Sequence, residues 1–253
     1  MSIVTVNRYL EDGDVLKAME SFKSIPDDGT GMTPEQANTA LRLVVALRKE
    51  GMYSAAREIY GAMKDTGMSE EASSVRARAA FNLFESYRKS GMFKEAEEML
   101  GAMAQLTPSA DVNLLRAMAS VNLVDAYLGT GEVKSAGSVF ESMDLLGDSE
   151  ELDLVKGTAA LSLLRHFADA LNYGEALEIF REILALGDYE DVAFLKAKAS
   201  VIMSKLAVTA GDPGRAKTIF GDLGALIESW PELWTYRDEV FSVIYEATGE
   251  TEF

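Results

Sequence analysis

The sequence predicts an all-helical protein built from repeated helical hairpins. Three observations support this: a 40-residue period, apolar residues at helical spacing on both sides of a repeated glycine, and no alternating segment rich in Val, Ile or Thr. The period is visible first in four glycines: Gly51, Gly91, Gly131 and Gly211. An alanine follows five residues after each glycine, and Ala176 occupies the remaining place in that column. We therefore expect five copies of a 40-residue unit.

Each unit is predicted to contain two helices joined at the glycine. In the segment KEGMYSAA the glycine stands where a helix end needs a positive φ, and a second helix follows at once. The sequence Thr33-Pro34-Glu35-Gln36 predicts a helix start, because the threonine can cap the helix and the glutamine can bond back to it. The long first helix of the second copy is expected from about Ser69 to Ser90.

We expect one domain over residues 1–253. Residues 1–25 are interpreted as a degenerate first hairpin, and residues 33–228 as the five 40-residue hairpins. Residues 229–253 are interpreted as a terminal capping helix with an acidic tail, and residues 25–31 have the composition of a linker.

The composition excludes several kinds of chemistry. The chain has no cysteine, so it cannot build a disulfide, a zinc ribbon or a thiol nucleophile by itself. Its one histidine, His166, allows no multi-histidine metal site and is expected to be structural. No glycine-rich loop ends in Lys-Ser or Lys-Thr, so a nucleotide site is not expected. We therefore predict no catalytic residues, no metal and no cofactor, and hence no enzyme.

Charge and hydropathy bear on location and partners. A net charge of −17 opposes binding to nucleic acid and to anionic membranes. No apolar run approaches the length of a membrane span, and the first residues lack the pattern of a secretion signal. A cytoplasmic location is therefore expected, with no membrane partner and with nucleic acid disfavoured.

One set of columns carries a family resemblance: Ala80, Leu83, Phe84 and Tyr87, followed by Gly91, Phe93, Ala96, Leu100, Met103 and Pro108. It resembles the tetratricopeptide repeat (TPR) over about residues 33–228, and the hairpin KEGMYSAAREIYGAMKDTGM also resembles a pentatricopeptide unit. The TPR resemblance implies a right-handed α–α superhelix, that is, a TPR-like solenoid, and a binding function. TPR units usually have about 34 residues, so this chain has longer units.

The candidate binding surface is the face of each first helix that lies opposite the buried stripe. It follows from a rotation of about 100° per residue, and in stacked hairpins this face lines the groove. Over five units the face holds seven basic and three acidic residues, a charge of +4 on a chain of −17. We select nine of its residues and call them the groove stripe: Arg42, Arg78, Asn82, Glu85, Asn122, Asp125, Arg165, Lys198 and Lys205. A solvated face with lateral ion pairs is the competing interpretation.

A second basic column lies one turn before the small buried residue of each first helix. Its members are Gln36, Arg76, Arg116, Lys156 and Lys196. We interpret this column as structural, with apolar stems packed on the core and an acidic partner from an adjacent helix.

These observations favour a protein- or peptide-binding scaffold or adaptor that binds an acidic, phosphorylated or otherwise anionic extended segment in the groove. Two alternatives stay open: a regulatory or sensor domain for a small anionic ligand, and an RNA-binding helical repeat, which the acidic composition disfavours. The last helix is rich in apolar residues, including Trp230, Trp234, Phe241 and Tyr245, so a homodimer through this helix is also considered.

Overall fold

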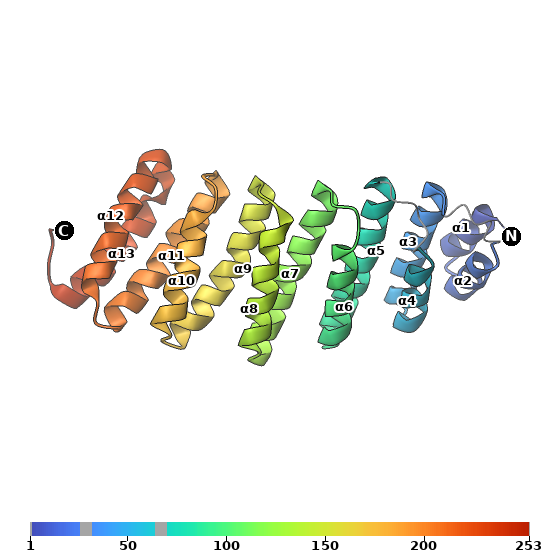
Figure 1. The fold of residues 1–253 in the computed structure, drawn as a ribbon, viewed down its shortest axis with the longest axis horizontal. Helices are drawn as coiled ribbons and strands as arrows, with labels where there is room; N and C mark the ends of the chain where they lie inside the picture. The colour runs from blue at the N-terminus through green and yellow to red at the C-terminus, as the bar shows by residue number, and fades with distance from the viewer. Residues whose placement is uncertain (1, 26–31, 64–69, 253) are drawn as a thin grey trace. The chain divides into compact units, whose positions relative to one another are not determined.

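The computed structural model describes residues 2–25, 32–63 and 70–252. Within these ranges it contains thirteen α-helices, two short 3-10 helices and no strand (Figure 1). The predicted all-helical class of helical hairpins is therefore confirmed for the described residues. Residues 26–31, which make up most of the predicted linker, lie outside them.

The chain forms two compact units, Met1–Ala119 and Ser120–Phe253, which divide within helix α7. The first unit contains α1 (Ile3–Glu11), α2 (Val15–Lys23), α3 (Pro34–Lys49), α4 (Tyr53–Ala62), α5 (Glu70–Lys89), α6 (Phe93–Ala104) and the beginning of α7 (Ala110–Thr130). The second unit contains the rest of α7, α8 (Val133–Glu141), η2 (Ser142–Leu146), α9 (Glu150–Asp169), α10 (Tyr173–Ala185), α11 (Glu190–Thr209), α12 (Pro213–Ser229), η3 (Pro231–Leu233) and α13 (Trp234–Thr248). The single-domain assignment and the right-handed superhelix stay predictions.

Successive helices pack as hairpins inside each unit. In the first unit α1 packs on α2, α3 on α4 and α5 on α6, and in the second unit α9 packs on α10 and α11 on α12. The first helices of successive hairpins also pack on one another, as α3 does on α5 and α9 on α11. Helix α5 begins at Glu70 and ends at Lys89, within a residue of the predicted bounds.

The hairpin turns share one backbone geometry. At the end of α3, Gly51 has a φ of 73°, and the N–H of Met52 donates to the carbonyl oxygen of Leu47 at 2.9 Å. This is the Schellman motif, which requires a left-handed residue and so favours glycine. The same combination of a positive φ and a closing bond recurs at Gly13, Gly91, Gly131 and Gly211. The predicted glycine turns are confirmed.

One turn in the second unit has this geometry without glycine. Leu171 occupies the place that the 40-residue period gives to glycine, and its φ is 53°. The N–H of Asn172 still donates to the carbonyl oxygen of Phe167 at 2.8 Å. A left-handed conformation costs an L-residue about 1–2 kcal/mol, so the turn between α9 and α10 carries a strain that the glycine turns avoid.

The predicted cap of α3 is present. The N–H of Gln36 donates to the hydroxyl oxygen of Thr33 at 3.2 Å, and the N–H of Thr33 donates to the Oε1 of Gln36 at 2.7 Å. Pro34 occupies the first turn, where its missing N–H costs nothing.

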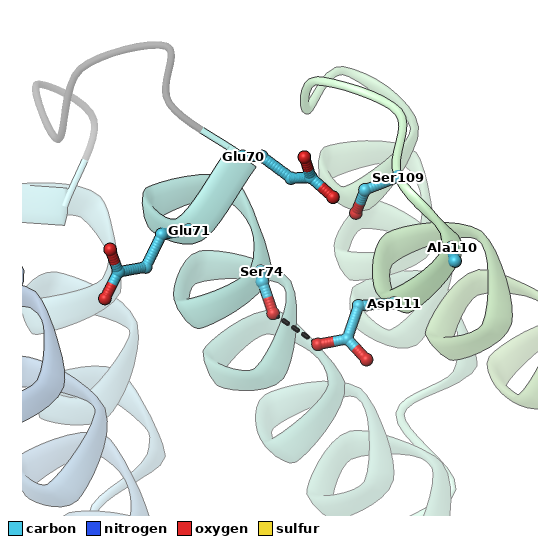
Figure 2. A pocket seen from close by; sticks show the side chains of 6 residues that line it. All are labelled: Glu70, Glu71, Ser74, Ser109, Ala110 and Asp111. Atoms are coloured by element: carbon cyan, nitrogen blue, oxygen red, sulfur yellow. Dashed lines mark hydrogen bonds between the residues drawn. The ribbon is translucent and has the colours of Figure 1, made fainter.

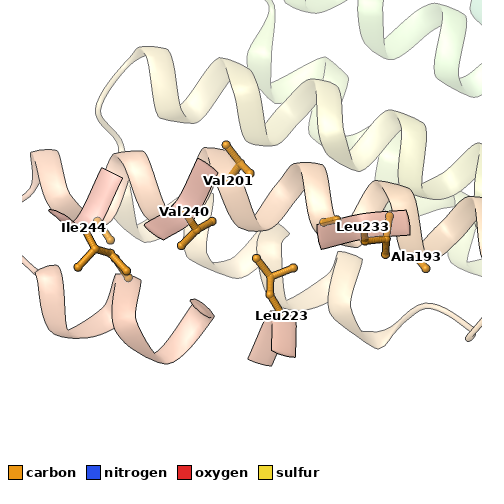
Figure 3. Packing of buried hydrophobic residues seen from close by; sticks show 9 residues of the cluster. Ala193, Val201, Leu223, Leu233, Val240 and Ile244 are labelled. Carbon is orange, nitrogen blue, oxygen red and sulfur yellow. The ribbon is translucent and has the colours of Figure 1, made fainter. Parts of the chain in front are cut away.

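The repeated columns form the core of both units. The alanines that follow each turn have no exposed surface: Ala56, Ala96, Ala136, Ala176 and Ala216. The burial predicted for this column is therefore confirmed. In the second unit, Leu223 of α12 and Val240 and Ile244 of α13 belong to one buried cluster with residues of α11 (Figure 3).

Candidate functional site

The groove stripe lies on the first helices of the hairpins, namely α3, α5, α7, α9 and α11. Each of its side chains is exposed or half-buried, whereas Leu43, Leu83 and Leu163 on the opposite side of their helices are at most 1% exposed. The exposed face was thus predicted correctly from the period. That this face binds a partner stays a prediction.

In the first unit, neighbouring helices hold both arginines of the stripe. The Nη1 of Arg42 donates to the Oδ1 of Asn7 on α1 at 3.0 Å. The Nη2 of Arg78 lies 2.6 Å from the Oδ2 of Asp111 at the start of α7. The same oxygen accepts a hydrogen bond from the hydroxyl of Ser74 at 2.5 Å. The Ser74 hydroxyl and the Arg78 guanidinium together lower the pKa of Asp111.

The other two stripe residues of α5 make bonds within the helix. The Nδ2 of Asn82 donates to the carbonyl oxygen of Arg78 at 2.8 Å. Glu85 pairs with the Nε of Arg88 at 3.0 Å and with the Nζ of Lys89 at 3.2 Å. Partial burial raises the pKa of Glu85, but these two cations outweigh it and the net pKa is lowered.

In the second unit, two cations of the stripe are available. Arg165 on α9 and Lys198 on α11 are exposed and have neither an ion pair nor a hydrogen bond from their side chains within the described part of the chain. Lys205 already has an acidic partner, because its Nζ lies 2.6 Å from the Oε1 of Glu239 on α13. Both members of that pair are about half exposed, so it contributes only about 0–1 kcal/mol.

An acidic column at the starts of the first helices changes the charge near the stripe. It starts the first helices at 40-residue intervals: Glu71, Asp111, Glu151 and Asp191. Because Asp111 pairs with Arg78, the value of +4 overstates the local charge around α5. The period of this column is visible in the sequence and could have revealed it.

The second basic column packs against the core, and its members meet partners of different kinds. Lys196 is 6% exposed, and its Nζ lies 2.9 Å from an Oδ1 of Asp188, in the loop just before its own helix. Lys156 pairs with Asp144 of η2. The guanidinium of Arg76 instead lies 5.5 Å from the centre of the Tyr60 ring. The predicted acid on an adjacent helix is therefore confirmed at Lys156, whereas Lys196 meets an acid in a loop and Arg76 meets an aromatic ring.

An open pocket of about 550 Å³ lies where α5 and α7 begin (Figure 2). Its lining residues are Glu70, Glu71, Ser74, Ser109, Ala110 and Asp111. Three carboxylates make the pocket negative, so it does not suit a small anionic ligand.

Other kinds of site are not found in the described ranges. No group of three or more Asp, Glu or His side chains there could hold a metal ion. His166 packs edge-on against Phe167, with ring centres 5.9 Å apart. No helix among these residues is both long and apolar enough to cross a membrane.

Comparison with known proteins gives two similarities. Residues 82–106, which span the end of α5, the Gly91 turn and α6, match the PPR repeat family. The solved structure of Pseudomonas aeruginosa PilF is 18% identical over 94% of this chain and 95% of that chain, with a TM-score of 0.40. No curated protein matches the chain. By its 40-residue period, its Schellman turns and the repeat match, the chain is a helical repeat protein that resembles the TPR and PPR families.

Proposed function

We propose that the protein is a non-enzymatic scaffold whose second unit binds an extended acidic or phosphorylated segment of a partner protein. The observation that carries this proposal is the pair of unpartnered cations in the groove stripe, Arg165 and Lys198, on the successive first helices α9 and α11. A guanidinium can bind a carboxylate or a phosphate through two parallel hydrogen bonds, and an ammonium acts as a point charge.

Two further stripe residues extend this surface. Lys205 can exchange its exposed pair with Glu239 for a ligand carboxylate at little cost. Asn122, half-buried on α7, can offer a side-chain amide to the backbone of an extended segment. In the first unit, Arg42 and Arg78 are already bonded to Asn7 and Asp111, so we expect them to contribute less.

The net charge of the body shapes the binding kinetics. With −17 overall, the protein repels an acidic segment at long range, while contacts in the groove act within the roughly 8 Å screening length of physiological salt. Association should therefore be slow at low salt and faster as salt screens the repulsion.

The test is a titration of fluorescently labelled octaglutamate, and of a labelled phosphoserine peptide, against the full chain. The double variant Arg165→Glu/Lys198→Glu should weaken binding at least about tenfold, since each reversal removes a charge-assisted contact. The matched control is Lys134→Glu/Arg181→Glu, which makes the same charge change at exposed residues of the second helices α8 and α10. Equal weakening by the control, or no binding by the wild type, would refute the groove assignment.

The match to the PPR repeat keeps RNA as a second candidate for the same surface. Single-stranded polyuridylate at low salt is the appropriate probe, because phosphate contacts are strongest there. We expect weaker binding than for the acidic peptides, since peptide binding needs only a few cations on this acidic body. Tight RNA binding that the Arg165→Glu/Lys198→Glu variant abolishes would replace the peptide proposal.

A further inference from the structure

Helix α13 is the last helix that the structure describes, and its neighbours differ from those of the first helices before it. In the second unit α10 covers α9 and α12 covers α11, whereas α13 packs on α11 and α12 and no described helix follows it. One side of α13 is buried, because Leu233 just before it and Val240 and Ile244 within it have no exposed surface (Figure 3). The question is what covers the other side.

The equivalent positions of α11 show how such a face is buried elsewhere in the repeat. Both helices end at a glycine with positive φ, 81° at Gly211 and 71° at Gly249. Counting back from these glycines pairs Trp234 with Lys196, Phe241 with Met203, and Tyr245 with Ala207. The α11 members are at most 6% exposed. In α13, by contrast, Trp234 is 57% and Tyr245 48% exposed, and Phe241 is half-buried.

These three residues of α13 form a continuous aromatic face. They are separated by seven and four residues, so they lie along one side of the helix. The rings of Phe241 and Tyr245 are parallel to within 3°, with centres 6.3 Å apart. Phe241 also contacts Phe220 of α12, with ring centres 6.2 Å apart. The face is therefore held in place by the core at Phe241, while Trp234 and Tyr245 expose about half of their surface.

We propose that this aromatic face binds a basic amphipathic helix of a partner protein, which packs on α13 in the way that α12 packs on α11. The shape follows from the second helices already present: α12 covers α11 with a stripe of Ala216, Ile219 and Leu223, each at most 1% exposed. A helix with the same small and apolar stripe fits the same register on α13. Tryptophan and tyrosine are also the side chains that most often dominate binding energy at interfaces.

The charge of the occupant follows from the surroundings of the face. Residues 228–253 contain seven acids and one base, Arg237. Asp238 lies on the face between Trp234 and Phe241, and Glu246 lies beside Tyr245; both acids are exposed. Lysines and arginines along the edges of the incoming helix would meet these acids. A second copy of α13 would bring the same negative charge to the contact, which disfavours self-association through this face.

The test uses two synthetic helices that share the apolar stripe and differ in charge. Both have the 17-residue sequence of α12. The basic peptide carries Asp222→Lys and Glu228→Lys, and the acidic peptide carries Arg215→Glu and Lys217→Glu. Fluorescence anisotropy of each labelled peptide with the full chain should show binding of the basic peptide and at least about tenfold weaker binding of the acidic one. Equal binding of the two peptides, or none of the basic one, overturns the proposal.

Variants of the protein locate the binding. Trp234→Glu and Tyr245→Glu change exposed side chains, so the fold should survive, as circular dichroism and the melting temperature would confirm. Each variant should weaken the binding of the basic peptide at least about tenfold. Leu145→Glu is the matched control, an apolar-to-acid change at a residue of η2 that is 80% exposed. Peptide binding that survives both α13 variants overturns the proposal. A dimer that light scattering detects and that Tyr245→Glu abolishes also overturns it, because the occupant of the face would then be a second copy of the chain. The Arg165→Glu/Lys198→Glu variant should leave this binding unchanged.

Discussion

The two units share the same buried columns but differ at a turn and at exposed positions, where core packing does not determine the residue. In the first unit the described hairpin turns carry glycine, and neighbouring helices hold the stripe arginines Arg42 and Arg78. The second unit contains the strained turn at Leu171, the two unpartnered stripe cations and the open face of α13. Buried columns repeat because each must fit the same neighbour in every hairpin. Departures from the repeat therefore point to positions that packing alone does not explain.

The largest expected effect is a loss of stability on overpacking the buried alanine column, and it tests whether this column is equally closely packed in the two units. Ala96→Leu in α6 and Ala136→Leu in α8 each add a side chain where none of the alanine is exposed. Overpacking should lower the free energy of unfolding by about 1–3 kcal/mol in each case. Urea denaturation of both variants checks this. An unchanged midpoint for either would show that its column is not closely packed.

The next effect concerns the turn that departs from the repeat. Leu171→Gly should raise the free energy of unfolding by up to about 1 kcal/mol, because the relieved strain exceeds the extra chain entropy of glycine in the unfolded state. The reverse change, Gly91→Leu, should destabilise the first unit by a similar amount. Melting temperatures of the two variants decide the matter. If Leu171→Gly melts no higher than the wild type, the strain assigned to this turn is absent.

A smaller effect is expected from freeing Arg78, which tests whether ion pairing distinguishes the stripe residues of the first unit from those of the second. Asp111→Asn should free Arg78, so the first unit would resemble the second and bind octaglutamate up to about fivefold more tightly, the equivalent of one exposed ion pair. Asp222→Asn on α12 makes the same charge change outside the stripe and serves as the control. The same gain in both variants would mean that net charge alone sets the affinity.

The smallest effect is a pH dependence. The Ser74 hydroxyl and Arg78 lower the pKa of Asp111 from its ordinary value of 3.8, so the folded state binds a proton there less readily than the unfolded state. The stabilisation from this carboxylate is therefore present above pH 3.8 and is lost as the pH falls below it. Because the pair is exposed, the loss should be only a few tenths of a kcal/mol. Stability of the wild type should fall more steeply with acid than that of Asp111→Asn, and parallel curves would argue against the bond.

The features that the sequence predicted correctly are those that depend on contacts inside one hairpin or on the 40-residue period. Ala136, the glycine turns and the cap at Thr33 are set by local backbone geometry, and the same geometry recurs every 40 residues. The pairing of Arg78 with Asp111 joins residues 33 positions apart on successive hairpins, so it depends on the packing between them.

Two other features could not be read from the period. A missing glycine at position 171 does not reveal that leucine adopts the left-handed conformation, because the period predicts the turn and not its cost. The ion pair of Lys205 depends on how α13 packs against α11, and α13 follows a 38-residue spacing between its turn glycine and Gly211.

The locality of the helix contacts has a consequence for folding. Among the described helices, the substantial contacts join helices that are adjacent or next but one along the chain. Such low contact order favours rapid folding, and stability becomes approximately a sum of hairpin terms and nearest-neighbour terms. The chain can therefore open in steps from an edge. Helix α13 has one open face, so its amide protons should exchange with solvent faster than those of α11, and a helix that docks on it would slow that exchange and hold the edge closed.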